Sequence, residues 1–76
     1  MGEHAATMYT SIRHNLGENI RALRIASGLT KVDFALLLGI SRVELDLIES
    51  GRSNVKLTTL SKLAVSLGKE PWELIK

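Results

Sequence analysis

The sequence predicts an all-α domain of five helices. Apolar residues recur at intervals of three and four along most of the chain, and no stretch alternates apolar and polar residues as a half-buried strand would. Glycines follow several of these apolar stripes, as they do at the C-termini of helices. With 76 residues, of which 45% are hydrophobic and only 4% aromatic, we expect a single small domain with an aliphatic core.

The first helix is predicted from an apolar stripe that begins in the second ten residues. Residues 1–10 show no sustained period, and we expect them to form a flexible tail or to extend the first helix. The stripe consists of Ile12, Leu16, Ile20 and Leu23, and Gly28 ends it. The folded domain is therefore expected over residues 11–76.

Two short helices are expected next, over Thr30–Leu38 and Ser41–Glu49. Thr30 suits the N-cap of the first, and the sequence Ser41-Arg42-Val43-Glu44 fits a capping box at the start of the second. The inward-facing residues are expected to be Phe34, Ala35, Leu38, Leu45 and Ile48. Gly39-Ile40-Ser41 supplies an unhindered residue, an apolar plug and a cap, so the pattern predicts a helix-turn-helix at residues 30–49.

The remaining two helices follow a short loop. A fourth stripe consists of Leu57, Leu60, Leu63, Ala64 and Leu67, and Gly68 closes it. Pro71 suits the first position of a short fifth helix, Pro71–Ile75.

Spaced positions along the chain resemble the Xre-type, or phage-repressor-type, helix-turn-helix domain over residues 14–75. They include Leu16-Gly17-Glu18-Asn19-Ile20-Arg21, Gly28-Leu29-Thr30, Phe34-Ala35, Gly39-Ile40-Ser41 and Ile48-Glu49-Ser50-Gly51. With its short loop after Gly51, the sequence is most similar to small stand-alone members of this family, such as the controller proteins of restriction–modification systems. The resemblance implies a cytoplasmic transcription regulator of bacterial or phage type that binds double-stranded DNA as a homodimer on a palindromic operator. It also implies an ion pair between Arg24 and Glu49 that ties the first helix to the third.

The resemblance places the second helix of the motif in the DNA major groove, with its N-terminal end toward the bases. On a helical wheel four residues face away from the core, and they are the candidates for base readout: Arg42, Val43, Asp46 and Leu47. The guanidinium of Arg42 can bridge O6 and N7 of guanine, or it can pair with Asp46 one turn later. Val43 and Leu47 can pack on thymine methyl groups, or they can contact a protein.

Phosphate contacts are expected on both sides of this helix. The candidates are Lys31, Ser41, Arg52, Ser53, Asn54 and Lys56. Relatives often carry Gln at the position of Lys31, and a lysine replaces a bidentate hydrogen bonder with a point charge. Lys56 stands near a helix N-terminus, where free N–H groups favour anions, although Thr58 could cap that helix and leave Lys56 as an exposed lysine.

The charge is distributed unevenly. The net charge is +2 and the isoelectric point is near 9.3. Residues 30–49 carry Lys31 and Arg42 against four acids, which gives −2, whereas residues 50–76 carry five cations and two acids, which gives +3. Because DNA affinity depends heavily on neutralising phosphates, one copy should bind weakly and dimerisation should be required.

Apolar residues outside the expected core suggest protein contacts. The dimer surface is expected at the C-terminus, with Trp72, Leu74 and Ile75, although Trp72 or Leu74 could instead plug the end of the core. A second apolar patch would be formed by Leu36, Leu37, Val43 and Leu47. This patch motivates the alternative of a protein-interaction module or an antitoxin-like partner binder.

Enzymatic, metal-dependent and membrane-spanning functions are disfavoured. The sequence has no cysteine, and its two histidines, His4 and His14, lie ten residues apart with no third ligand near them. No phosphate-binding glycine loop or nucleophile motif occurs, and we expect no metal or cofactor. No apolar run approaches the ~18 residues of a membrane span.

Overall fold

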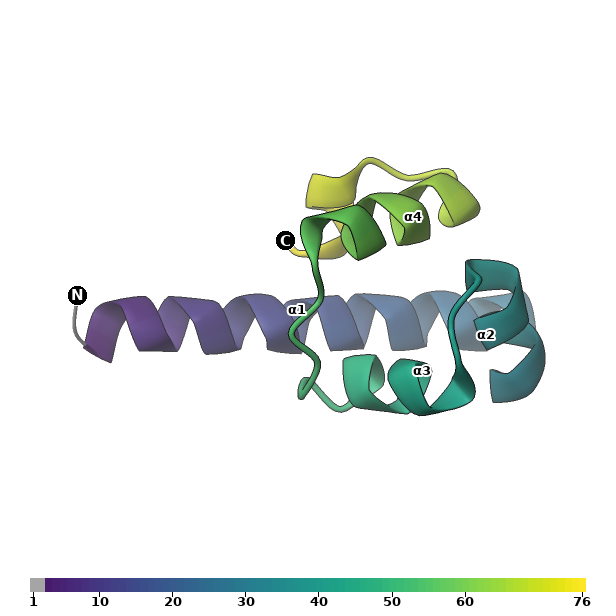
Figure 1. The fold of residues 1–76 in the computed structure, drawn as a ribbon, viewed down its shortest axis with the longest axis horizontal. Helices are drawn as coiled ribbons and strands as arrows, with labels where there is room; N and C mark the ends of the chain where they lie inside the picture. Colours follow the sequence, from purple (N-terminus) through teal and green to yellow (C-terminus); the bar gives the residue numbers. More distant parts are fainter. Residues whose placement is uncertain (1–2) are drawn as a thin grey trace.

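The computed structural model describes the backbone of residues 3–76 and the side chains of residues 11–76. The elements are α1 (Glu3–Ser27), α2 (Lys31–Leu38), α3 (Arg42–Glu49), α4 (Leu57–Leu67) and the 3₁₀ helix η1 (Pro71–Leu74), shown in Figure 1. Since residues 3–76 contain no strand, the described chain has the all-α fold that the sequence predicts.

The prediction of a fifth helix is corrected to a single 3₁₀ turn. The N–H of Glu73 donates to the carbonyl of Glu70 at 3.0 Å, and that of Ile75 donates to the carbonyl of Trp72 at 3.3 Å. These bonds span three residues rather than four, which is the 3₁₀ pattern. Pro71 occupies its first position as expected, but four α-helices, not five, occur in residues 3–76.

The first helix starts earlier than its apolar stripe. It begins at Glu3, so it includes most of the segment 1–10 that was expected to be a tail or an extension of the helix. Met1 and Gly2 lie outside the described residues, and the flexibility of the segment remains a prediction.

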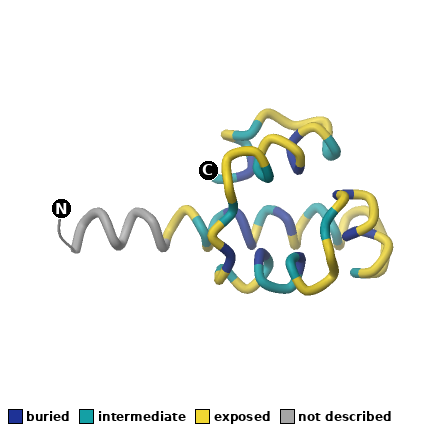
Figure 2. Tube along the Cα trace, viewed as in Figure 1, coloured by how far each residue is buried: buried dark blue, intermediate teal, exposed yellow. Residues whose placement is uncertain are grey.

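The core lies between α1 and the other elements (Figures 1 and 2). Helix α1 packs against α3 and η1, and α2 packs against α3 and α4. The buried residues are Leu16, Ile20, Phe34, Ala35, Leu38, Leu45, Ile48, Leu63, Ala64 and Leu74. As the composition predicts, this core is aliphatic apart from Phe34.

Local signals in the sequence place α2 and α3. The hydroxyl of Thr30 accepts a hydrogen bond from the N–H of Asp33, and that of Ser41 accepts one from the N–H of Glu44. Between the helices Gly39 has a φ of 72°, which favours glycine, and Ile40 packs against the core. The turn thereby fixes the direction in which α3 leaves α2.

Gly17 sets how closely α1 and α3 approach. A Cβ atom at this position would lie 2.5 Å from the carbonyl oxygen of Ile48 and 3.0 Å from that of Glu49. Only a residue without a side chain allows α3 to pack at this distance from α1.

Candidate nucleic-acid interface

The start of α3 is exposed to solvent. Ser41, Arg42 and Val43 are exposed, and 70% of Val43 is accessible. On the opposite side of the helix, Leu45 and Ile48 are fully buried. Helix α3 therefore presents the guanidinium of Arg42 and the methyl groups of Val43 to a ligand, which suits base edges in a major groove.

The other two predicted base-reading residues are less available. Leu47 is half-buried, and Asp46 is half-buried and engaged in an ion pair. The Nζ of Lys31, at the first position of α2, donates to Oδ1 of Asp46 at 2.9 Å. This hydrogen bond holds the pKa of Asp46 below its ordinary value, with further help from the charges of Lys31, Arg42 and Arg24. Lys31 was expected to contact phosphate, and here it binds a carboxylate.

The C-terminal end of α3 is fastened to α1 by Arg24 and Glu49. Nε of Arg24 donates to Oε2 of Glu49 at 2.7 Å, and NH2 donates to Oε1 at 2.9 Å. The hydrogen bonds that Arg24 donates to Glu49 raise the pKa of Arg24, and the two side chains are only 17% and 8% exposed. The bidentate geometry fixes the orientation of α3, so both residues serve the structure of the site.

The loop after α3 is ordered by a hydrogen bond to α3. Ser53 is 7% exposed, and its hydroxyl donates to Oε1 of Glu44 at 2.8 Å. The expected phosphate contact from Ser53 is corrected accordingly, because its side chain is buried against Glu44. The capping box is corrected as well: Ser41 caps α3, but the Glu44 carboxylate accepts from Ser53 and does not return to Ser41.

The other expected phosphate ligands are exposed. Nε of Arg52 donates to the hydroxyl of Ser50 at 3.0 Å, and the side-chain oxygen of Asn54 accepts from Arg13 at 3.4 Å. Lys56 occupies the N-cap of α4 without a side-chain capping bond, and Thr58 does not take that role. The N–H groups in the first turn of α4 consequently lie beside a cation.

Several of these groups line one shallow polar depression of about 480 Å³. Its lining residues are Arg21, Arg24, Lys31, Asp46, Glu49, Ser50 and Arg52. Sequence reasoning missed Arg21, although its position three residues before Arg24 places both on one face of α1. The depression joins α1, the start of α2, the end of α3 and the following loop.

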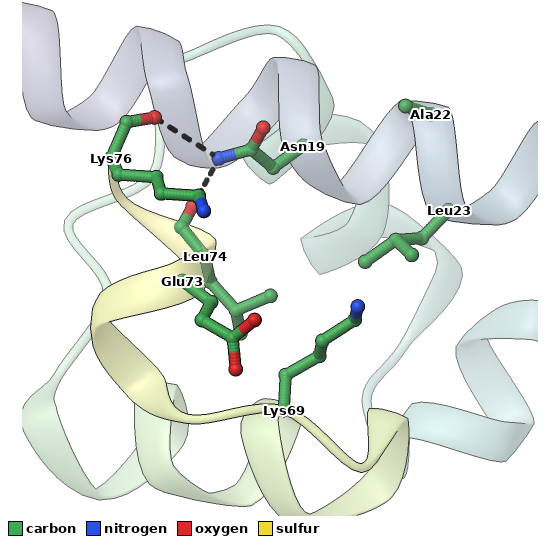
Figure 3. A pocket seen from close by; sticks show the side chains of 7 residues that line it. All are labelled: Asn19, Ala22, Leu23, Lys69, Glu73, Leu74 and Lys76. Atoms are coloured by element: carbon green, nitrogen blue, oxygen red, sulfur yellow. Dashed lines mark hydrogen bonds between the residues drawn. The ribbon is translucent and has the colours of Figure 1, made fainter.

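The C-terminal turn separates the three residues that were expected in a dimer surface. Leu74 is 1% exposed and belongs to the core, so its assignment to the dimer surface is corrected. The Asn19 side-chain amide donates to the carbonyl of Leu74 at 2.9 Å and to that of Lys76 at 3.4 Å, which anchors the turn on α1 (Figure 3). Trp72 is 59% exposed beneath the Lys76 ammonium, 4.9 Å from the ring centroid, and Ile75 is half-buried.

Other apolar side chains are accessible on α2 and α4. Leu36 is 77% exposed and Leu37 51%, as the predicted second patch requires, whereas Leu47 in the same patch is half-buried. On α4, Leu57 was expected in the apolar stripe but is 81% exposed, and sequence reasoning missed Val65, which is also 81% exposed. An apolar hollow of about 230 Å³ also lies at the end of the domain, lined by Ile12, Arg13, Leu16, Ser53, Val55, Leu57, Leu60 and Ile75.

The fold and this surface define a DNA-binding helix-turn-helix domain. A helix-turn-helix family model matches residues 20–74, and the chain belongs to the Xre-type helix-turn-helix family. This is a family of DNA-binding regulators, which are generally not enzymes. No curated protein matches the chain, and no helix among the described residues is long and apolar enough to cross a membrane.

The solved structures that are similar to this chain include the following two. The restriction–modification controller protein C.AhdI from Aeromonas hydrophila is 36% identical, with a TM-score of 0.74 over 87% of this chain and 96% of that one. The hypothetical transcription factor NHTF from Neisseria is 28% identical, with a TM-score of 0.76 over 86% of this chain and 75% of that one.

Proposed function

We propose that this protein is a sequence-specific transcription regulator that binds a palindromic operator as a homodimer. The observation that carries the proposal is the orientation of α3, which exposes Arg42 and Val43 at its start while Arg24 and Glu49 fasten its end to α1. A rigidly held helix with an exposed arginine at its N-terminal end is suited to direct readout in the major groove. The likeness to a restriction–modification controller and a transcription factor supports this function.

The charges on this surface support a dimer. Arg42, Arg52 and Lys56 are exposed near α3 and form no ion pair with a described carboxylate. Three phosphate contacts give a salt slope of about −2.7 for one protomer on duplex DNA, and about −5.4 for two. Two copies related by a two-fold axis would double both the contacts and the base readout.

The apolar hollow near the C-terminus offers a surface for the second copy. Leu57, at its rim, is 81% exposed, and Ile75 lines the same hollow. We propose that these residues and the exposed Trp72 form the dimer contact, in place of the buried Leu74. Leu57→Lys should give a monomer by light scattering without loss of helix content, whereas Val32→Lys on α2 should leave the mass unchanged.

Selection from random-sequence DNA at low salt, with a light-scattering mass in the same buffer, tests the function. We expect a palindromic motif and the mass of a dimer, with a salt slope near −5.4 or steeper on the selected site. Arg42→Ala should relax the preference at one position in each half-site, at a cost of about 1–3 kcal/mol. Selection that enriches no motif would refute sequence-specific binding.

A second candidate function is the binding of a protein partner. The protein would then act either as an antitoxin-like protein, which binds both DNA and the partner, or as an interaction module that does not bind DNA. The exposed Leu36, Leu37 and Val43 favour it, because apolar side chains on a free helix surface are typical of protein contacts. Leu36→Lys and Val43→Lys distinguish the two functions. If Val43 contacts the DNA bases, only Val43→Lys should change the selected motif. If Leu36 and Val43 belong to a surface for a protein partner, both variants should abolish association with the partner and leave the selected motif unchanged.

A further inference from the structure

The ion pair between Lys31 and Asp46 joins a predicted phosphate ligand to a predicted base reader. The Lys31 side chain is 41% exposed and that of Asp46 is 40% exposed, with 2.9 Å between Nζ and Oδ1. Both groups remain accessible to water and to an incoming ligand. An exposed pair of this kind contributes little to folding stability, so stabilising α2 against α3 is not a sufficient reason for it.

Lys31 cannot give its full charge to DNA while this pair is intact. Asp46 takes one of the three N–H donors of this ammonium and offsets its positive charge, so it weakens the attraction of Lys31 to a phosphate oxygen. An aspartate is ionised at neutral pH, and the hydrogen bond from Lys31 lowers the pKa of Asp46 further, so the carboxylate always competes for Lys31. Arg21 and Arg52, which line the same depression, form no ion pair with a described carboxylate.

Asp46 also lies on the helix that the proposed function places in the major groove. It is on the same side of α3 as Arg42, one turn later. A carboxylate in the major groove can accept a hydrogen bond from the amino group of cytosine, and adenine also carries an amino group there. A base of this kind can therefore compete with Lys31 for Asp46.

We propose that Asp46 is a specificity-determining residue, which withholds Lys31 from the DNA backbone until a base amino group binds the carboxylate. The inference rests on the proposed function and extends it. On a wrong sequence Asp46 keeps Lys31, and the protomer makes its other phosphate contacts only. On the operator a base takes Asp46, and the released Lys31 adds one phosphate contact, so a correct base strengthens backbone binding as well as readout.

Asp46→Asn tests the proposal, because it preserves shape and removes the charge that holds Lys31. Asp33→Asn is the matched control, since Asp33 is an exposed carboxylate on α2 with no ion pair to a described residue. Binding would be measured by fluorescence anisotropy on the selected operator and on a scrambled duplex of equal length. The set is completed by Lys31→Met and by Lys31→Met with Asp46→Asn, after circular dichroism has shown native helix content.

On the scrambled duplex at about 0.1 M salt, we expect Asp46→Asn to bind about eightfold more tightly per protomer, the value of one added phosphate contact. Its salt slope should steepen by about 0.9 per protomer, whereas Asp33→Asn should gain about twofold or less. The gain should vanish when Lys31 is Met. On the operator Asp46→Asn should not bind more tightly than wild type, so the ratio of operator to scrambled affinity should fall.

Three results would overturn the inference. The first is a gain on scrambled DNA no larger than that of Asp33→Asn. The second is a gain that persists in the Lys31→Met background, and the third is an equal gain on operator and scrambled DNA, which would make Asp46 a general source of repulsion. The proposed function fails separately if the wild type binds no duplex or selects no motif, whatever Asp46→Asn does.

Discussion

Replacing Gly17 by alanine should destabilise the domain, although alanine is the better helix former. In an exposed helix this change would add about 1 kcal/mol of stability. At Gly17 the new Cβ would lie 2.5 Å from the carbonyl oxygen of Ile48 and 3.2 Å from the carbonyl carbon of Glu49. These are backbone atoms of α3 and cannot rotate away, so α1 and α3 must separate. Overpacking of this severity costs about 3 kcal/mol, which leaves a net loss of about 2 kcal/mol.

Thermal unfolding followed by far-ultraviolet circular dichroism measures this effect. A loss of about 2 kcal/mol should lower the Tm by about 10 °C in a domain of this size. The matched control is Gly28→Ala, where nothing lies within 4 Å of the new Cβ and only a φ of 72° opposes the change, at about 1 kcal/mol. If Gly17→Ala raises the Tm, helix propensity outweighs packing, and the close approach of α1 to α3 is not a constraint on the position of the proposed reading helix.

Three further changes probe the ion pairs and the loop. Arg24→Met should lower the free energy of unfolding in urea by about 2–3 kcal/mol, because it leaves the nearly buried Glu49 carboxylate unpaired. Adding Glu49→Leu should restore part of this loss. If it restores none, the loss comes from the packing of Arg24 and not from the ion pair. Ser53→Ala should lower the free energy of unfolding by about 1–2 kcal/mol, because Glu44 loses the hydrogen bond that it accepts from the Ser53 hydroxyl. The control Ser61→Ala, on the exposed face of α4, should leave the stability unchanged. Equal effects of the two changes would contradict a role for the Ser53 hydroxyl. Because the pKa of Asp46 is lowered in the folded state, its contribution to stability is fully present above its unfolded pKa of 3.8 and is lost as the pH falls through the lower folded value. Below pH 4 the free energy of unfolding of Asp46→Asn should therefore fall less steeply with pH than that of the wild type. An identical pH dependence in the two proteins would contradict the pairing of Asp46 with Lys31.

The helices of the motif could be predicted because their signals are local. The Thr30 and Ser41 caps and the left-handed Gly39 depend on residues at most a few positions away. The inward faces of α2 and α3 follow from helical periodicity alone, and Phe34, Leu38, Leu45 and Ile48 are buried as expected. These elements also fix which end of α3 is exposed, so the position of Arg42 and Val43 could be inferred before the structure.

The C-terminal turn could not be resolved from the sequence. Three apolar residues within four positions give no period, and the choice of Leu74 over Trp72 for the core depends on α1. Asn19 binds the carbonyl of Leu74 across 55 positions of sequence, a partner that no local rule identifies. For the same reason the sequence predicted a fifth helix where the chain forms a single 3₁₀ turn.

The acidic residues of the motif show a similar limit. Helical spacing pairs Asp46 with Arg42 four residues earlier, but in the structure Asp46 accepts a hydrogen bond from Lys31 on the neighbouring helix. The capping-box pattern predicts that the Glu44 carboxylate accepts a hydrogen bond from the backbone of the N-cap residue, but in the structure it accepts one from the buried hydroxyl of Ser53. In both cases a partner brought near by tertiary packing outcompetes the neighbour along the helix.

These partners change what the net charge of −2 on residues 30–49 means for DNA binding. Of the four carboxylates, Glu49 binds Arg24, Asp46 binds Lys31 and Glu44 binds Ser53, so three of them already have a partner within the domain. Arg24 comes from α1, outside the segment, and offsets one charge that the local sum counts against binding. Exposed cations lie at both ends of α3, Arg42 at its start and Arg52 with Lys56 after its end. Attraction to phosphates on both flanks, with a nearly neutral helix between them, would place α3 across a groove and leave the choice of sequence to its side chains.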